Sequence, residues 1–152
     1  MDAETIRRLV AELDTTRATS AEKAWAELRG LGPAVAPWLL EAFPRFRTWQ
    51  GRVGLVFHSI RHARTSEEAF RLGALGCRDR SYMVRYRACG LLAYSQRTDA
   101  IAHVTPLLSH KDGRTVEDAL AAIDAIESRN HHYFVDRDHS GRVHWCVNDD
   151  DG

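Results

Sequence analysis

Residues 79–96 read DRSYMVRYRACGLLAYSQ, and this stretch decides the fold that the sequence predicts. After a short turn, Val84, Ala88 and Leu92 recur at helical spacing, which predicts a helix. Its centre contains small residues, among them Ala88 and Gly90, and small residues let a neighbouring helix approach closely. We therefore expect this helix to pack against neighbours on two sides.

A similar pattern returns at residues 112–126, which read DGRTVEDALAAIDAI. The correspondence pairs Asp79 with Asp112, Val84 with Val116, Ala88 with Leu120, and Leu91 or Leu92 with Ile123. The pattern thus recurs after about one supersecondary unit, and an apolar pattern that repeats at such intervals is typical of stacked helical hairpins.

Apolar periodicity and capping signals predict the remaining helices. Asp2 is suited to cap the first helix, Thr19 followed by Glu22 fits a capping box for the second, and Ser66 begins the fifth. The expected helices, besides the one in residues 79–96, cover about residues 2–13, 19–32, 31–43, 49–63, 66–75, 100–108 and 115–128.

Two phrases, LGPAVAPWLLEAF (31–43) and D-x-x-x-x-V-R-x-x-A-x-x-L-L (79–92), resemble HEAT-type helical repeats. The resemblance covers about residues 20–128 and implies a mainly α fold, a right-handed α-solenoid of about four helical hairpins. It is weaker at Arg52, which no Asp precedes, and at Glu117, which replaces the usual Arg. In this family the turn Asp and the helix Arg commonly pair, which implies a structural role for Asp79 and Arg85.

The pattern changes after Ser128. Tyr133 and Val135 lead into a turn-forming segment, and Val143, Trp145 and Val147 lead out of it at alternate positions. This alternation predicts a C-terminal β-hairpin, with Trp145 covering the last helical pair. We expect one domain over residues 1–152, with helical repeats in 1–128, the hairpin in 129–148 and a frayed acidic tail in 149–152.

Charge is unevenly distributed although the net charge is zero. Residues 44–97 carry eleven arginines and three acidic residues, whereas residues 98–152 carry five basic and eleven acidic residues. The N-terminus is charged from its second residue, and the three cysteines show no paired spacing. These features, with no long apolar run, predict a cytoplasmic protein.

Arginines gather at the entries of two helices that occupy equivalent places in successive hairpins. Stacking would bring them together as a basic ridge comprising Arg45, Arg47, Arg52, Arg78, Arg80, Arg85 and Arg87. Such a ridge would dock an acidic protein surface or neutralise nucleic-acid phosphates. The alternative is an ordinary solvated face, or internal pairing with the acidic C-terminal part. As partner-binding residues we select Arg45, Arg47, Arg52, Arg78, Arg80 and Arg87.

Metal-binding and catalytic patterns are weak. Asp136-x-Asp138-x-Ser140-Gly141 matches the first half of a calcium loop, but Val147 stands where a bidentate Glu is needed, so an ordinary turn is favoured. The C-terminal histidines, and the pair His58 and His62 on a helix, fit packed or solvated side chains better than metal ligands. No nucleophile-elbow, P-loop or dinucleotide motif is present. We therefore expect neither an enzyme nor a cofactor.

These observations favour a non-catalytic helical-repeat module that binds another protein with an acidic surface. A small stand-alone, bacterial-looking chain of this kind resembles the inhibitor (immunity) proteins that are paired with secreted toxins, some of which are HEAT-like. The alternative is a protein that binds nucleic acid through the same arginines. HEAT-like DNA glycosylases, which are similar in helical architecture, bind DNA through a basic concave face.

Overall fold

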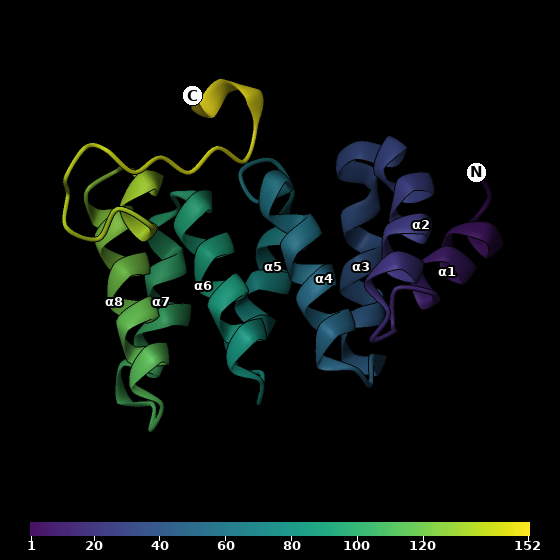
Figure 1. The fold of residues 1–152 in the computed structure, drawn as a ribbon, viewed down its shortest axis with the longest axis horizontal. Coiled ribbons are helices and arrows are strands. Elements are labelled where there is room, and N and C mark those ends of the chain that lie inside the picture. The colour runs from purple at the N-terminus through teal and green to yellow at the C-terminus, as the bar shows by residue number, and fades with distance from the viewer.

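A computed structural model describes residues 1–152, and the chain is mainly helical. Figure 1 shows that the α-helices follow one another in chain order along the long axis of the molecule. The longest, α6 and α8, have 14 and 15 residues, and none is long and apolar enough to cross a bilayer. The α-helices are α1 (Ala3–Ala11), α2 (Ala18–Leu28), α3 (Ala36–Ala42), α4 (Trp49–Ser59), α5 (Glu67–Gly76), α6 (Tyr82–Ser95), α7 (Ile101–Val104) and α8 (Gly113–Glu127).

Short polar side chains begin four of these helices by accepting hydrogen bonds from the first free backbone N–H groups. Asp2 accepts from Thr5 N at 2.8 Å, and Ser66 accepts from Ala69 N at 3.1 Å, as the sequence predicts. Thr48 caps α4 and Asp112 caps α8 in the same way. The capping box predicted at Thr19 is wrong, because α2 already begins at Ala18 and has no side-chain cap.

Helix α6 lies at the centre of the core, between α4, α5 and α8 (Figure 1). Its residues from Ala88 to Ser95 are all buried. A Cβ atom on Gly76 of α5 would stand 2.8 Å from the Ala88 Cβ atom, so the two helices are as close as a glycine allows. The expected packing of α6 on more than one side is confirmed, and it depends on these small residues.

Two ion pairs made by buried arginines connect alternate helices. Arg52 of α4 places Nε 2.8 Å from Asp79 Oδ2 in the turn before α6, and Arg85 of α6 places Nη2 3.5 Å from Asp112 Oδ2 at the start of α8. The spacing from arginine to aspartate is the same in both pairs, and Arg85 follows Arg52 by as many positions as Asp112 follows Asp79. Both arginines are buried, so each pair ties a helix to the turn of the following hairpin.

Asp79 and Arg85, which the resemblance implies to be partners, are connected through the backbone of Asp79 and not through its carboxylate. Arg85 Nη1 donates to the backbone carbonyl of Asp79 at 3.0 Å, while the Asp79 carboxylate pairs with Arg52 of the preceding hairpin. Both residues are therefore structural, but the carboxylate connects two hairpins instead of closing its own turn.

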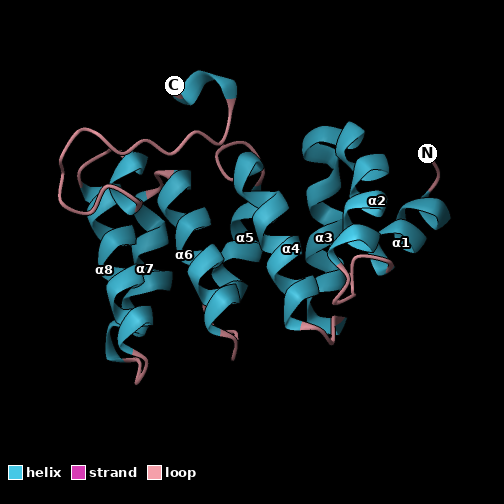
Figure 2. Cartoon of the chain, in the orientation of Figure 1, coloured by secondary structure: helices cyan, strands magenta, loops and turns pink.

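The predicted C-terminal β-hairpin is wrong, because the structure contains no strand (Figure 2). Residues His131–Phe134 and Asp149–Asp151 form short 3-10 turns joined by an irregular segment. Side chains satisfy the backbone donors that a strand partner would have taken: Trp145 N donates to His132 Nδ1, and Val147 N donates to Asp151. The predicted fold class fails at this point, whereas its mainly helical part is observed.

The C-terminal segment runs along one end of the helical array, and its residues 137–144 are exposed (Figure 1). The Trp145 ring lies 5.8 Å from the Tyr94 ring and 5.6 Å from the Phe134 ring, so it packs on α6. Asp151 is only 8% exposed and accepts a hydrogen bond from the Tyr94 hydroxyl at 2.8 Å. The tail predicted to fray is therefore held at Asp151.

Candidate functional site

The arginines selected from the sequence fall into three different environments. Four of them lie on the loops that join α3 to α4 and α5 to α6, at the same end of the helical array (Figure 1). One is buried beneath those loops, and one lies further along α6. The structure therefore brings four of the six selected arginines to one end of the helical array and places the other two elsewhere.

The four loop arginines form what we call the basic edge, which consists of Arg45, Arg47, Arg78 and Arg80. All four are exposed. Arg47, Arg78 and Arg80 have no acidic oxygen within 4.0 Å, and Arg45 has only Glu41 at 3.8 Å. Three guanidinium groups on this edge are therefore without an internal counter-charge.

Asp14 and Thr48 hold the first of these loops in place. Asp14 accepts hydrogen bonds from Arg47 N at 3.0 Å and from Thr48 N and Oγ1 at 2.9 and 2.7 Å. Burial opposes ionisation of Asp14, but these donors outweigh it and lower the pKa of the carboxyl group. The loop that presents Arg45 and Arg47 is thus fixed by a residue from the distant turn after α1.

Arg52 is not part of the exposed edge, because its side chain is only 7% exposed and lies under both loops. It donates to Phe46 O and Arg47 O at 3.3 Å in the first loop and to both carboxylate oxygens of Asp79 in the second. Asp79 in turn accepts from Ser81 N at 2.9 Å. Arg52 therefore positions the edge rather than contributing to its surface. The equal spacing of Arg52 from Asp79 and of Arg85 from Asp112 is the signal that could have revealed this role.

Arg87 also lies away from the basic edge, in the second turn of α6. Its guanidinium carbon is 4.9 Å from the centre of the Phe57 ring and 5.3 Å from that of Tyr86. Its Nε atom is buried and has no hydrogen-bond partner. Arg87 belongs to a second surface, built from aromatic residues of α2, α4 and α6.

Sequence reasoning missed this aromatic surface. His58 stacks on Trp25 with 3.8 Å between ring centres, and Phe57, which is 48% exposed, lies 5.3 Å from the same imidazole. Burial, aided by Arg29 and Arg61, lowers the pKa of His58 to about 4. His58 is thus a packed, neutral ring at pH 7. The available signal was its separation from Trp25, which is one full repeat of the helical pattern.

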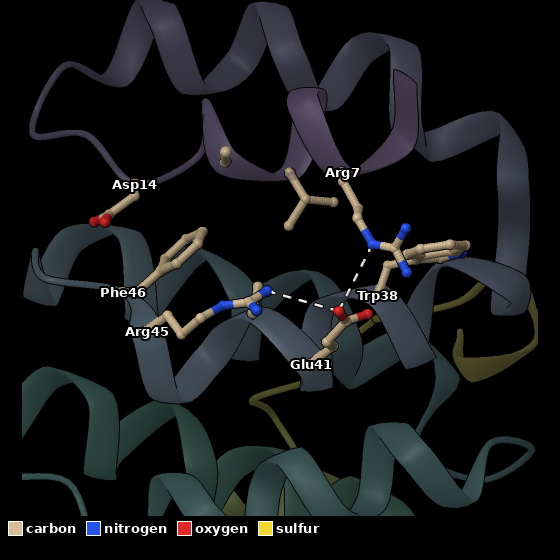
Figure 3. A pocket seen from close by; sticks show the side chains of 9 residues that line it. Arg7, Asp14, Trp38, Glu41, Arg45 and Phe46 are labelled. Carbon is tan, nitrogen blue, oxygen red and sulfur yellow. Dashed lines mark ion pairs between the residues drawn. The ribbon is translucent and has the colours of Figure 1, made fainter. Parts of the chain in front are cut away.

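A cavity of about 170 Å³ lies between α1 and α3 (Figure 3). In Figure 3 Glu41 lies between Arg7 and Arg45, at 3.7 and 3.8 Å from their nitrogens, and the Arg7 guanidinium covers the Trp38 ring at 5.0 Å. The carboxylate is shared by the two arginines, so the cavity holds its own counter-ion. Its charge is therefore partly balanced without a ligand.

The turn at Asp136 uses its carboxylate internally. Asp136 accepts from Ser140 Oγ, Ser140 N and Gly141 N at 2.7, 3.0 and 2.8 Å, and these hydrogen bonds lower its pKa despite burial. His131 and His132 lie with ring centres 4.0 Å apart, and the structure holds no group of three or more His, Cys, Asp or Glu side chains arranged for a metal ion.

Neither a protein-family model, nor a curated protein, nor a solved structure matches the chain. The candidate site is therefore defined by the residues of this molecule alone.

Proposed function

We propose that the protein is a non-catalytic, HEAT-like binding module that recognises an acidic surface of another protein through its basic edge. The observation that carries this proposal is the exposure of Arg47, Arg78 and Arg80 without any internal counter-ion on loops that Arg52 and Asp79 hold rigidly. Rigid loops lose little conformational freedom on association, which favours binding.

Apolar residues beside the arginines favour a protein over a nucleic acid. Trp49, 44% exposed, follows the first loop, and Met83, 36% exposed, follows the second. Arginine, aromatic residues and methionine are enriched at protein interfaces, whereas a phosphate-binding edge needs only positive charge. Binding of nucleic acid through the same arginines is the alternative, and it would require no contribution from Trp49 or Met83.

A toxin inhibitor is one specific form of this proposal, and it would appear as a single stoichiometric partner. As part of the same proposal we place the protein in the cytoplasm, where the thiols of Cys77, Cys89 and Cys146, which are free in the structure, would stay reduced.

The test is affinity capture with nuclease treatment at two salt concentrations, followed by titration of the captured partner. Changing Arg47, Arg78 and Arg80 together to Glu should weaken partner binding by roughly 100-fold or more, about 2.7 kcal/mol, because three charges facing an acidic surface are reversed. Circular dichroism should stay helical, since these side chains form no ion pair and donate no hydrogen bond within the protein.

The matched control reverses three other exposed arginines that have no ion pair, Arg71, Arg129 and Arg142. This variant has the same net charge as the first. It should retain binding if the partner recognises the basic edge and not the overall charge of the protein. Equal binding by both variants would contradict the proposal. Capture of nucleic acid alone, lost at high salt, would favour the alternative.

A further inference from the structure

A second cavity, of about 300 Å³, lies between the helices and the C-terminal segment, at the opposite end of α4 from the basic edge. Residues from α2, α4, α6 and the C-terminal segment form its wall. Among them are Trp25, Phe57, His58, Arg61, Arg87 and Trp145. Its size suits a small ligand rather than a macromolecule.

The cavity is cationic and lacks a counter-charge. Arg61 and Arg87 line it, no acidic residue does, and neither arginine forms an ion pair in the structure. The buried Nε atom of Arg87 is a donor without a partner. Because that atom has no exposed surface, an anion in the cavity would meet the other atoms of the Arg87 side chain, which is only partly buried. The cavity between α1 and α3 differs, because there Glu41 supplies the counter-charge to Arg7 and Arg45.

The rest of the wall is flat and apolar. Trp25 and His58 form one stacked pair, Phe57 presents an exposed ring beside them, and Trp145 closes the side formed by the C-terminal segment. His58 is uncharged at neutral pH because its pKa is lowered, so its ring behaves as another aromatic surface. Such walls stabilise a planar apolar group by offset or edge-on contact.

We propose that this cavity binds a small aromatic carboxylate. The carboxylate would be held by the guanidinium groups of Arg87 and Arg61, because Arg pairs with planar anions through paired N–H donors. The ring would lie against Trp25, Phe57 and Trp145. This site is independent of the basic edge and of any protein partner.

Calorimetric titration of the full-length protein with 2-naphthoate tests the proposal, with uncharged 2-naphthamide as the matched ligand. We expect 2-naphthoate to bind at least tenfold more tightly than the amide. Arg87→Gln should abolish that preference, and Arg78→Gln on the basic edge should leave it unchanged. Arg61→Gln, at an exposed position without an ion pair, should also reduce the preference and covers the case in which Arg87→Gln fails to fold.

Cys146 provides a second readout inside the cavity. It is the exposed cysteine, whereas Cys77 and Cys89 are buried, so a thiol-reactive probe reports on this position. Saturating 2-naphthoate should slow labelling of Cys146 at least severalfold, and 2-naphthamide at the same concentration should not. Equal binding of the two ligands, or tight binding of 2-naphthoate without protection of Cys146, would overturn the proposal.

Discussion

Single buried charges determine how the surface of this protein is presented. Arg52 contacts the backbone of one arginine-bearing loop and the aspartate of the next, so one guanidinium fixes both halves of the basic edge. Its partner Asp79 has a side chain only 7% exposed. A buried carboxylate that loses its counter-ion is strongly destabilising, whereas the intact pair contributes little net stability.

Arg52→Met should therefore lower the free energy of unfolding by about 3 kcal/mol, because it leaves Asp79 buried and unpaired. Arg47→Met is the control, in the adjacent loop, and should change stability by no more than about 0.5 kcal/mol because its side chain is exposed. Urea unfolding followed by circular dichroism measures both. A similar small effect in the two variants would show that Arg52 does not hold the loops.

A third pair of the same kind exists with its charges exchanged. Asp118 follows Arg85 at the same spacing as Arg85 follows Arg52, so it occupies the equivalent buried position of α8. Its Oδ1 atom is 2.9 Å from Arg137 Nη2, and this partner comes from the C-terminal segment instead of a following helix turn. The C-terminal segment thus provides the opposite charge at this position, while the Asp118 Oδ2 atom stays without a hydrogen-bond partner.

At the scale of elements, the C-terminal segment replaces the expected hairpin and is held by polar contacts to α6. Burial would raise the pKa of Asp151, but hydrogen bonds from Asn148 N, the Tyr94 hydroxyl and Val147 N outweigh it and lower that pKa. Burial lowers the pKa of His131, which lies beneath the same segment. Both shifts make protonation unfavourable in the folded state, so acid should loosen the segment.

Asp151→Asn should release this segment at pH 7, because a neutral amide cannot accept from three donors as a carboxylate does. We expect the amide protection factors of Trp145, Val147 and Asn148 to fall at least tenfold, while α1 stays unchanged. Asp150→Asn, an exposed neighbour, is the control and should have no effect.

The same anchor should weaken in the wild-type protein as the pH falls. The contribution of His131 is complete above about pH 6.5 and declines as the pH falls below that value, and that of Asp151 declines below about pH 4. Protection factors, which correct for the intrinsic pH dependence of exchange, should therefore decrease from pH 7 to pH 4. Unchanged protection in Asp151→Asn at pH 7 would rule out this anchor.

Across the whole molecule, the helices were predictable because apolar spacing and caps such as Asp2 and Ser66 are local signals. The repeat was predicted with a register error: Leu120, matched to Ala88, is 55% exposed, and the buried equivalent of Ala88 is the next residue, Ala121. The irregular C-terminal segment was not predictable from its sequence. Its alternating residues suit a β-strand, but they suit equally well an irregular chain whose backbone N–H groups donate to side chains. The second cavity was missed because its residues come from segments distant in the sequence.

The constant spacing from Arg52 to Arg85 and from Arg85 to Asp118 makes a whole-molecule prediction. Residues 49–81 make up one full repeat. If each hairpin contacts only its neighbours, a second copy of these residues inserted directly after Ser81 should be tolerated. The added Arg52 then meets an added Asp79, and α6 keeps its own contacts. We expect the lengthened protein to unfold cooperatively and to gain helical ellipticity in proportion to its length.

The matched control inserts a second copy of residues 49–78 directly after Ser81. It adds almost the same helical sequence, but it omits Asp79 and is shorter than a full repeat. The added Arg52 would then lack its carboxylate, and the following helix would turn its apolar face away from the core. This variant should lose stability or cooperativity relative to the first. If both duplications fold equally well, the spacing has no structural meaning, and the resemblance to HEAT repeats loses its main support. If only the duplication of residues 49–81 folds, hairpin stacking in a fixed register determines the architecture.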